Sequence, residues 1–117
     1  MSDLASEWIA AAESYLAECM NLSSPPRASE LAARLNITPV QLAREFRGSV
    51  GSNISSFLKE RQVELAKLLL QRTTMSTAEI AERAGFGTPR TFYRAFRRTT
   101  GMTPSAFRAE RNVSGPS

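Results

Sequence analysis

The stretch AERAGFGTPRTFYRAFRRTTGMTP, residues 81–104, decides the fold of this chain. It contains two helix-start signals, Thr88-Pro89 and Thr103-Pro104. Threonine caps the first N–H groups of a helix, and proline fits the first turn, where its missing N–H is not needed. Gly85-Phe86-Gly87 forms the turn before the first start, and Gly101 ends the helix before the second. The stretch therefore predicts short helices in close succession, and its arginines predict a basic surface on them.

The same helical spacing of apolar residues continues along the rest of the chain, and no alternating strand pattern interrupts it. The expected fold class is all-α with about seven helices, and residues 112–117 are expected to form a disordered tail. The expected helices span about residues 6–22, 28–35, 38–49, 54–71, 76–84, 88–99 and 103–111.

An internal repeat relates the two halves of the chain. Glu30, Ala32 and Arg34 match Glu79, Ala81 and Arg83 at an offset of 49, and one inserted residue at Gly87 changes the offset to 50. In each copy a short helix with a small residue is followed by a tight turn and a second helix, which is a helix-turn-helix pattern. The later matches pair Thr38-Pro39, Arg44, Phe46, Arg47, Gly51, Phe57, Glu60 and Arg61 with Thr88-Pro89, Arg94, Phe96, Arg97, Gly101, Phe107, Glu110 and Arg111.

The repeat predicts one domain over residues 1–111 with two subdomains. The first helix-turn-helix subdomain, with a leading helix, covers residues 8–52, a linker helix covers 54–72, and the second subdomain covers 76–111. A helix of about 18 residues spans about 27 Å at 1.5 Å per residue. With the flanking turns, this spacing approaches one turn of B-DNA, about 34 Å. Both second helices can then enter successive major grooves, so a monomer can read two half-sites.

Composition and charge favour a polyanionic partner. The 117 residues have a formal net charge of +4 and are 42% hydrophobic. Residues 1–30 hold five acidic residues and one basic residue, so the remainder has a net charge of +8. No run approaches the roughly 20 apolar residues of a membrane span, and the N-terminus is too acidic for a targeting peptide. We expect a cytoplasmic protein without a membrane partner.

The residue inventory argues against catalysis. The chain has no histidine and a single cysteine, Cys19, which lies on an apolar helix stripe and is expected to be buried. A lone thiol cannot build a tetrahedral zinc site, and no paired carboxylates or nucleophile–base set is present. Gly85-Phe86-Gly87 lacks the preceding strand that a dinucleotide site needs. We expect no enzyme, no catalytic residue, no metal and no cofactor.

The segment from Glu79 to Arg108 closely resembles the C-terminal signature of AraC/XylS-type transcription regulators. Asn36 in the first copy, ELAARLNITPVQLAREF (residues 30–46), stands where that family commonly has glycine, and asparagine also tolerates a left-handed conformation. The resemblance covers about residues 8–111. The matching elements of the signature are Ile80-Ala81, Gly85-Phe86, Phe92 and Phe96, Arg97-Arg98, Gly101-Met102-Thr103-Pro104 and Phe107-Arg108.

The resemblance implies a sequence-specific binder of double-stranded promoter DNA, usually an activator that contacts RNA polymerase. It implies either a single-domain member or the DNA-binding portion of a longer regulator. The operator, the regulated genes, activation versus repression, any effector and the oligomeric state stay open.

Helical phase sorts the candidate DNA contacts. The inward residues Leu42, Phe46, Phe92 and Phe96 leave the opposite faces of the two second helices to solvent, where arginine can bind guanine, glutamine adenine, and valine a thymine methyl. Threonine-capped helix starts and the remaining basic residues suit phosphate. The candidate base contacts are Val40, Gln41, Arg44, Arg90, Thr91 and Arg94, and the candidate phosphate contacts are Thr38, Arg47, Lys59, Thr88, Arg97 and Arg98.

An alternative hypothesis is a helical protein-interaction module that keeps this fold without specific DNA binding. Such a module would more naturally expose apolar patches on its second helices, whereas here arginines recur at matched outward positions. The repeat of those arginines therefore favours DNA.

Overall fold

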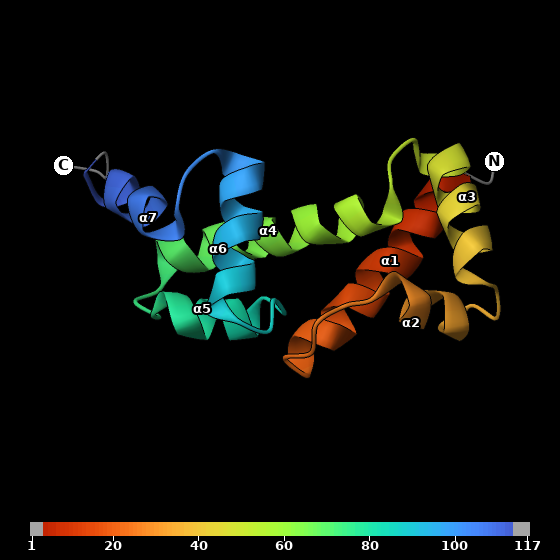
Figure 1. The fold of residues 1–117 in the computed structure, drawn as a ribbon, viewed down its shortest axis with the longest axis horizontal. Coiled ribbons are helices and arrows are strands. Elements are labelled where there is room, and N and C mark those ends of the chain that lie inside the picture. The colour runs from red at the N-terminus through yellow and green to blue at the C-terminus, as the bar shows by residue number, and fades with distance from the viewer. Residues whose placement is uncertain (1–3, 114–117) are drawn as a thin grey trace. The chain divides into compact units, whose positions relative to one another are not determined.

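The computed structural model describes the backbone of residues 4–113 and the side chains of residues 4–110, and over this part of the chain it contains seven helices and no strand (Figure 1). The predicted all-α class is confirmed. The helices are α1 (Leu4–Asn21), α2 (Ala28–Arg34), α3 (Pro39–Val50), α4 (Ile54–Arg72), α5 (Thr77–Arg83), α6 (Pro89–Thr100) and α7 (Pro104–Val113).

The C-terminal boundary differs from the expectation. α7 includes residues 112 and 113, which the sequence assigns to a disordered tail. The preceding residues favour helix without a proline or glycine until Gly115, so nothing in the local sequence stops α7 at 111. Residues 114–117 of the predicted tail lie outside the described part of the chain.

The chain forms two compact units, an N-terminal unit (Met1–Lys59) and a C-terminal unit (Glu60–Ser117). The boundary falls inside α4, which belongs to both. Ile54, Phe57 and Leu58 of this helix are buried in the core of the N-terminal unit. Val63 and Ala66 are buried in the core of the C-terminal unit. α4 therefore does more than span a distance, because each of its ends completes one hydrophobic core.

In the N-terminal unit, α1 and α2 both pack on α3. Leu42 and Phe46 of α3 are fully buried, and the ring of Phe46 meets Phe57 edge to face at 5.3 Å between centroids. Ala32 is also fully buried, which permits the close crossing of α2 and α3 expected from its small side chain. The lone cysteine, Cys19, is buried, as predicted.

In the C-terminal unit, α6 packs on α5 and α7. Four phenylalanines form a continuous series, with ring centroids 5.2 Å apart for Phe86–Phe92, 5.6 Å for Phe92–Phe96 and 5.4 Å for Phe96–Phe107. Aromatic pairs in such tilted and edge-on arrangements add about 0.5–1.5 kcal/mol each beyond the burial of their area. The prediction that these rings pack the core is confirmed.

The two helix-turn-helix turns share one backbone geometry. Asn36 and Gly85 both have positive φ, 59° and 78°. In the first turn Ile37 N–H donates to the Ala32 carbonyl at 3.0 Å, and in the second Phe86 N–H donates to the Ala81 carbonyl at 2.8 Å. These are the long-range bonds of a Schellman C-cap, which directs the chain sharply away from the helix end. The structural repeat therefore has the offset of 49 that the sequence predicts for this segment.

Candidate nucleic-acid interface

The exposed face of α3 begins at a well-capped helix start. Thr38 has an extended backbone, and its Oγ1 accepts from Gln41 N–H at 3.0 Å, while Gln41 Oε1 accepts from Thr38 N–H at 3.0 Å. This capping box, which satisfies two of the orphan N–H groups, and Pro39 in the first turn fix where α3 starts. Leu42 and Phe46 anchor the opposite face in the core. The candidate contacts Val40, Gln41, Arg44 and Arg47 are all exposed.

α6 repeats this construction in the C-terminal unit. Thr88 has an extended backbone and its Oγ1 accepts from Thr91 N–H at 3.1 Å, and Pro89 opens the helix. Phe92, Ala95 and Phe96 turn inward, so the opposite side of α6 is left to solvent. The candidate contacts on that side are Arg90, Thr91, Arg94, Arg97 and Arg98, and all are exposed.

The remaining candidates differ in what their side chains already do. The hydroxyls of Thr38 and Thr88 serve as helix caps, and Thr88 Oγ1 also lies 3.0 Å from Thr91 Oγ1. Lys59 is exposed on α4, at the end of the N-terminal unit. Within each unit, the structure brings the candidates on the second helix together on one face, whereas Lys59 stands on a separate helix.

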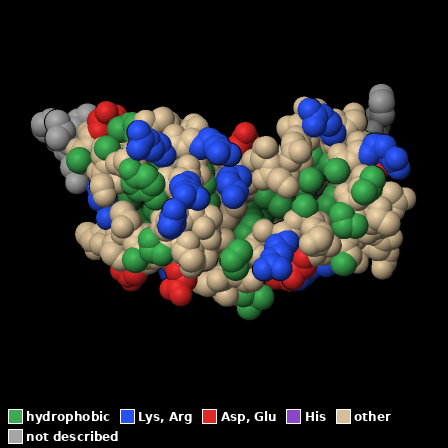
Figure 2. All heavy atoms as spheres, in the orientation of Figure 1, with side chains coloured by type: hydrophobic (Ala, Val, Ile, Leu, Met, Phe, Trp, Pro, Cys, Tyr) green, Lys and Arg blue, Asp and Glu red, His purple; other side chains and the backbone are tan. Residues whose placement is uncertain are grey.

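The positive charge of the α6 arginines is not paired with acidic side chains in the part of the chain that the structure describes. Among the described residues, none of the four arginines Arg90, Arg94, Arg97 and Arg98 forms an ion pair with an acidic side chain. α6 itself contains no acidic residue. Figure 2 shows Lys and Arg side chains, in blue, gathered over this helix. Unpaired arginines on one exposed helix face have their donors free for phosphate or for base edges.

Tyr93 is an exposed residue on α6 that sequence reasoning missed. Its side chain is 43% exposed, and its hydroxyl lies 3.4 Å from Nη1 of Arg97, one turn along the helix. The signal was available, because helical phase places residue 93 about 100° away from Phe92 and therefore off the buried face. Tyr93 extends the exposed face and holds Arg97 against it.

Gly48 is a second position that the sequence analysis passed over. It lies on the exposed side of α3, one turn after Arg44, and a Cβ built on it meets nothing within 4 Å. Neither crowding nor a positive φ therefore requires glycine there. At the repeat offset of 50, Gly48 corresponds to Arg98.

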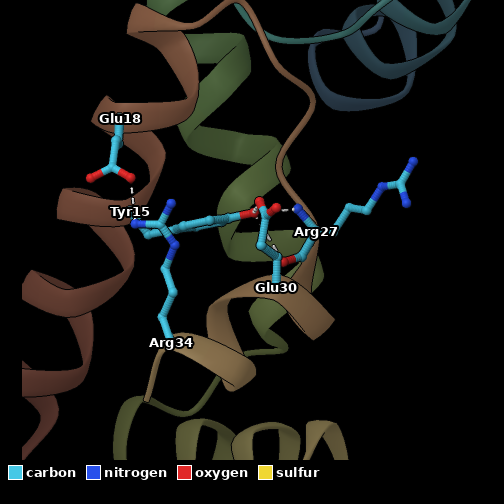
Figure 3. Close-up of polar contacts among 5 residues, drawn as sticks. All are labelled: Tyr15, Glu18, Arg27, Glu30 and Arg34. Atoms are coloured by element: carbon cyan, nitrogen blue, oxygen red, sulfur yellow. Dashed lines mark hydrogen bonds and ion pairs between the residues drawn. The ribbon is translucent and has the colours of Figure 1, made fainter. Parts of the chain in front are cut away.

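A tyrosine-centred network fixes the start of α2 in the N-terminal unit (Figure 3). The Tyr15 hydroxyl accepts from the backbone N–H of Arg27 at 2.8 Å and donates to Glu30 Oε1 at 2.6 Å. Burial raises the pKa of Tyr15 well above its ordinary value; the Arg27 backbone N–H opposes this, and the Glu30 carboxylate adds to it. The hydroxyl therefore stays protonated and ties α1 to the first turn of α2.

Arg34 belongs to the same network. Its guanidinium forms an ion pair with Glu18 and lies over the ring of Tyr15, 5.2 Å from the centroid (Figure 3). The hydrogen bond that Arg34 donates to the Glu18 carboxylate raises the pKa of Arg34. Arg34 matches Arg83 in the repeat, yet its charge is already paired within the N-terminal unit.

Two side chains organise the C-terminal unit. Gln62 is buried, and its Nε2 donates to the Ala84 carbonyl at 2.9 Å. Arg108 donates to three backbone carbonyls, those of Leu70 at 3.1 Å, Met75 at 2.6 Å and Thr73 at 3.1 Å. Arg108 therefore caps the end of α4 and holds the loop before α5, so its guanidinium is not part of the exposed basic face.

Other kinds of site find little support in the part of the chain that the structure describes. No group of three or more His, Cys, Asp and Glu side chains is placed to hold a metal ion there. None of the helices in this part combines the length and the apolar character needed to cross a membrane.

Comparisons with known proteins agree with this construction. A family described as a helix-turn-helix domain matches residues 31–110. The arabinose operon regulatory protein of Escherichia coli (strain K12) is 33% identical over 81 residues, which are 69% of this chain and 28% of that protein. The chain spans less than a third of the length of the first curated relatives it matches.

Solved structures are similar to this chain along nearly its whole length. The DNA-binding domain of AdpA, a global transcriptional factor solved in complex with a target DNA, has a TM-score of 0.79 and 30% identity, covering 99% of each chain. The C-terminal domain of AraT, a response regulator from Geobacillus stearothermophilus, has a TM-score of 0.81 and 26% identity, covering 99% of this chain and 92% of that one.

Proposed function

Because the chain belongs to the family of AraC-type helix-turn-helix transcription regulators, we propose that it binds double-stranded promoter DNA in a sequence-specific manner and regulates transcription. The observation that carries the proposal is the paired construction of α3 and α6. Each helix starts at a Thr-Pro cap, is buried on one side by apolar anchors, and exposes arginines on the other. The family and the fold are those of transcription regulators and not of enzymes.

We propose that base edges are read from the exposed faces of the two helices. Arg44, Arg90 and Arg94 suit guanine O6 and N7, because a guanidinium can donate two parallel hydrogen bonds to them. Val40 is 70% exposed, and an apolar side chain on a polar face suits contact with a thymine methyl. Thr91 adds a hydroxyl at the same end of α6.

Gln41 is the base-contact candidate that its helix cap constrains. Pairing with adenine uses the glutamine oxygen as an acceptor for N6 and the amide nitrogen as a donor to N7. That oxygen already accepts from Thr38 N–H. Gln41 would therefore have to share its oxygen or leave the capping box in order to read adenine, whereas donation from Nε2 needs no such change.

We propose that phosphate is held by two kinds of group. The starts of α3 and α6 at Thr38 and Thr88 present first-turn N–H groups and the positive end of the helix dipole. Arg47, Lys59, Arg97 and Arg98 add positive charge on exposed side chains. Such contacts set affinity and orientation and carry no direct sequence information.

The wider role is proposed from the family and from the linker helix. α4 has 19 residues, about 28 Å at 1.5 Å per residue, which supports reading of two adjacent major grooves by one monomer. We further propose the organisation inferred from the sequence, a single DNA-binding domain with two helix-turn-helix subdomains. A cytoplasmic location, activation, and contact with RNA polymerase beside the promoter complete the proposal.

Selection from a random duplex library at near-physiological salt, followed by sequencing, tests this function. Enrichment of two short boxes about one helical turn apart is the expected result. Tight binding without enrichment would contradict sequence-specific reading, and no retention even at low salt would favour the protein-interaction module instead. The double variant Arg90→Ala/Arg94→Ala is the matched control, because it should fold and should lose enrichment of one box only.

A further inference from the structure

The two units carry very different charge. Residues 1–59 contain six acidic and five basic side chains, a net charge of −1, whereas residues 60–117 contain five acidic and ten basic side chains, a net charge of +5. The net charge of the whole chain, +4, therefore resides entirely in the C-terminal unit. A protein whose positive charge is spread evenly would attract DNA through both units. Here only the C-terminal unit has a net positive charge.

The repeat locates the difference on the two second helices. α6 exposes an arginine at positions 90, 97 and 98. The matched positions 40, 47 and 48 of α3 hold valine, arginine and glycine, so α3 lacks the arginine at 40 and 48. α3 also exposes Glu45, whereas the matched Ala95 of α6 is buried. The helix residues of α6 thus carry four arginines and no acid, and those of α3 carry two arginines and one glutamate.

Internal pairing does not reduce this contrast, because it engages arginines outside the two second helices. In the N-terminal unit Arg34 is engaged by Glu18 and by the ring of Tyr15. In the C-terminal unit Arg108 is bound to backbone carbonyls, but it lies on α7, and the described arginines of α6 form no ion pair with an acidic side chain. The exposed face of α3 therefore presents a small apolar side chain, two arginines and a bare backbone position, Val40, Arg44, Arg47 and Gly48.

Resting on the function proposed above, we propose that the two units divide DNA binding unequally. The C-terminal unit supplies most of the salt-dependent attraction to any duplex, because each neutralised phosphate releases condensed counterions. The N-terminal unit, slightly negative overall, adds affinity mainly on sequences that fit the exposed face of α3. Its weak attraction to other sequences increases discrimination, since specificity is a difference between two affinities.

Salt titrations of the full chain test this division. The probe is a pool of random-sequence duplexes of about 40 base pairs, about four helical turns, followed by fluorescence anisotropy. The slope of log K against log salt is negative, and each lost phosphate contact reduces its magnitude by about 0.9. The double variant Arg97→Gln/Arg98→Gln removes two proposed phosphate contacts and should flatten the slope on this pool by about 1.8. Arg44→Gln/Arg47→Gln removes one, Arg47, and should flatten it by no more than about 0.9. Equal flattening by the two double variants would overturn the division.

A gain of charge on α3 provides the reciprocal test. The double variant Glu45→Gln/Gly48→Arg raises the net charge of residues 1–59 from −1 to +1, and both positions are exposed with open space at Gly48. Affinity for the random pool should rise, the slope should steepen by at least about 0.9, and preference for the duplex enriched from the library should fall. An unchanged slope and preference would contradict the proposal.

The division and the underlying function fail in different ways. If the unaltered chain binds random duplex and both pairs of arginines contribute equally, DNA binding stands and the unequal division is overturned. If the unaltered chain binds no duplex even at low salt, the proposed function is overturned and the division with it. Thermal unfolding by circular dichroism confirms that each variant is folded before its slope is read.

Discussion

The side chain of Gln62 in α4 donates a hydrogen bond of 2.9 Å from Nε2 to the backbone carbonyl of Ala84, the C-cap residue of α5, 22 residues further along the chain. Gln62 is only 3% exposed. The carbonyl it satisfies directly precedes Gly85, the positive-φ residue of the second turn. One buried amide therefore joins the central helix to the turn that orients α6.

The variant Gln62→Leu tests the importance of this bond. It leaves the Ala84 carbonyl without its partner, and an unsatisfied buried polar group costs about 1–3 kcal/mol. We expect the free energy of unfolding, measured by urea denaturation, to fall by that amount. Gln71→Leu on the exposed surface of the same helix is the control and should change stability little. Equal losses in both variants would show that the bond to Ala84 contributes nothing particular.

Gly48→Ala should stabilise the protein. The glycine lies inside α3 with open space around its Cα, so alanine gains helix propensity of about 0.5–1 kcal/mol without a clash. Gly51→Ala is the matched control three residues on, because Gly51 has a φ of 90° that alanine adopts only with strain. Thermal unfolding should show a higher midpoint for the first variant and a lower one for the second.

Arg108→Lys should destabilise the C-terminal unit. A guanidinium can reach the carbonyls of Leu70, Thr73 and Met75 together, whereas an ammonium on a single stem cannot reproduce that fork. Hydrogen bonds from charged groups contribute about 1.5–3 kcal/mol, and we expect a loss of about 2 kcal/mol. Hydrogen exchange should show faster opening around residues 70–75, with the N-terminal unit unaffected. If hydrogen exchange around residues 70–75 is no faster in the variant than in the unaltered protein, this role is contradicted.

Tyr15 should make stability fall at alkaline pH. The pKa of its hydroxyl is raised in the folded state above the ordinary value near 10. The contribution of Tyr15 to stability is therefore complete below about pH 10. It is lost as the pH rises above that value, because the hydroxyl ionises more easily in the unfolded chain. Tyr15→Phe should lose about 1 kcal/mol at neutral pH and should decline less between about pH 10 and 12. Parallel declines in the two proteins would exclude Tyr15 as the cause.

Arg94→Ala and Arg97→Ala should separate base reading from phosphate binding. Loss of Arg94 is expected to cost about 1–3 kcal/mol on the enriched duplex and to relax the base preference at one position. Loss of Arg97 should weaken all sequences alike and lower the salt slope by about 0.9. Anisotropy titrations on enriched and random duplexes distinguish the two. If both variants behave identically, the assignment of these two contacts is incorrect.

Much of the fold follows from local signals in the sequence. The helix starts at Thr38 and Thr88 are capped as their residue types predict, and the turn at Asn36 has the left-handed backbone that asparagine tolerates. The core positions of Phe92 and Phe96 follow from helical phase. These features depend on residues within about one turn of each other, so neighbouring sequence is sufficient to specify them. The same phase placed the candidate DNA contacts on the exposed side.

Other features depend on residues far apart in the chain. Arg108 looks like another surface arginine in the sequence, yet in the fold it is bound to carbonyls more than 30 residues away. Arg34 likewise looks like a surface arginine in the sequence, yet it joins Tyr15 in a network between α1 and α2. The tertiary structure therefore determines which arginines remain free for DNA.

By itself, the sequence determined the helices, their caps, the repeat and the basic character of the second half, because each follows from helical period, turn chemistry or charge. The tertiary structure alone decided that α4 completes two separate cores, that Gln62 supports the second turn, and which arginines are consumed internally. Those outcomes depend on which surfaces meet when helices pack. Side-chain partners across such a contact have no fixed spacing along the chain, so no local pattern can reveal them.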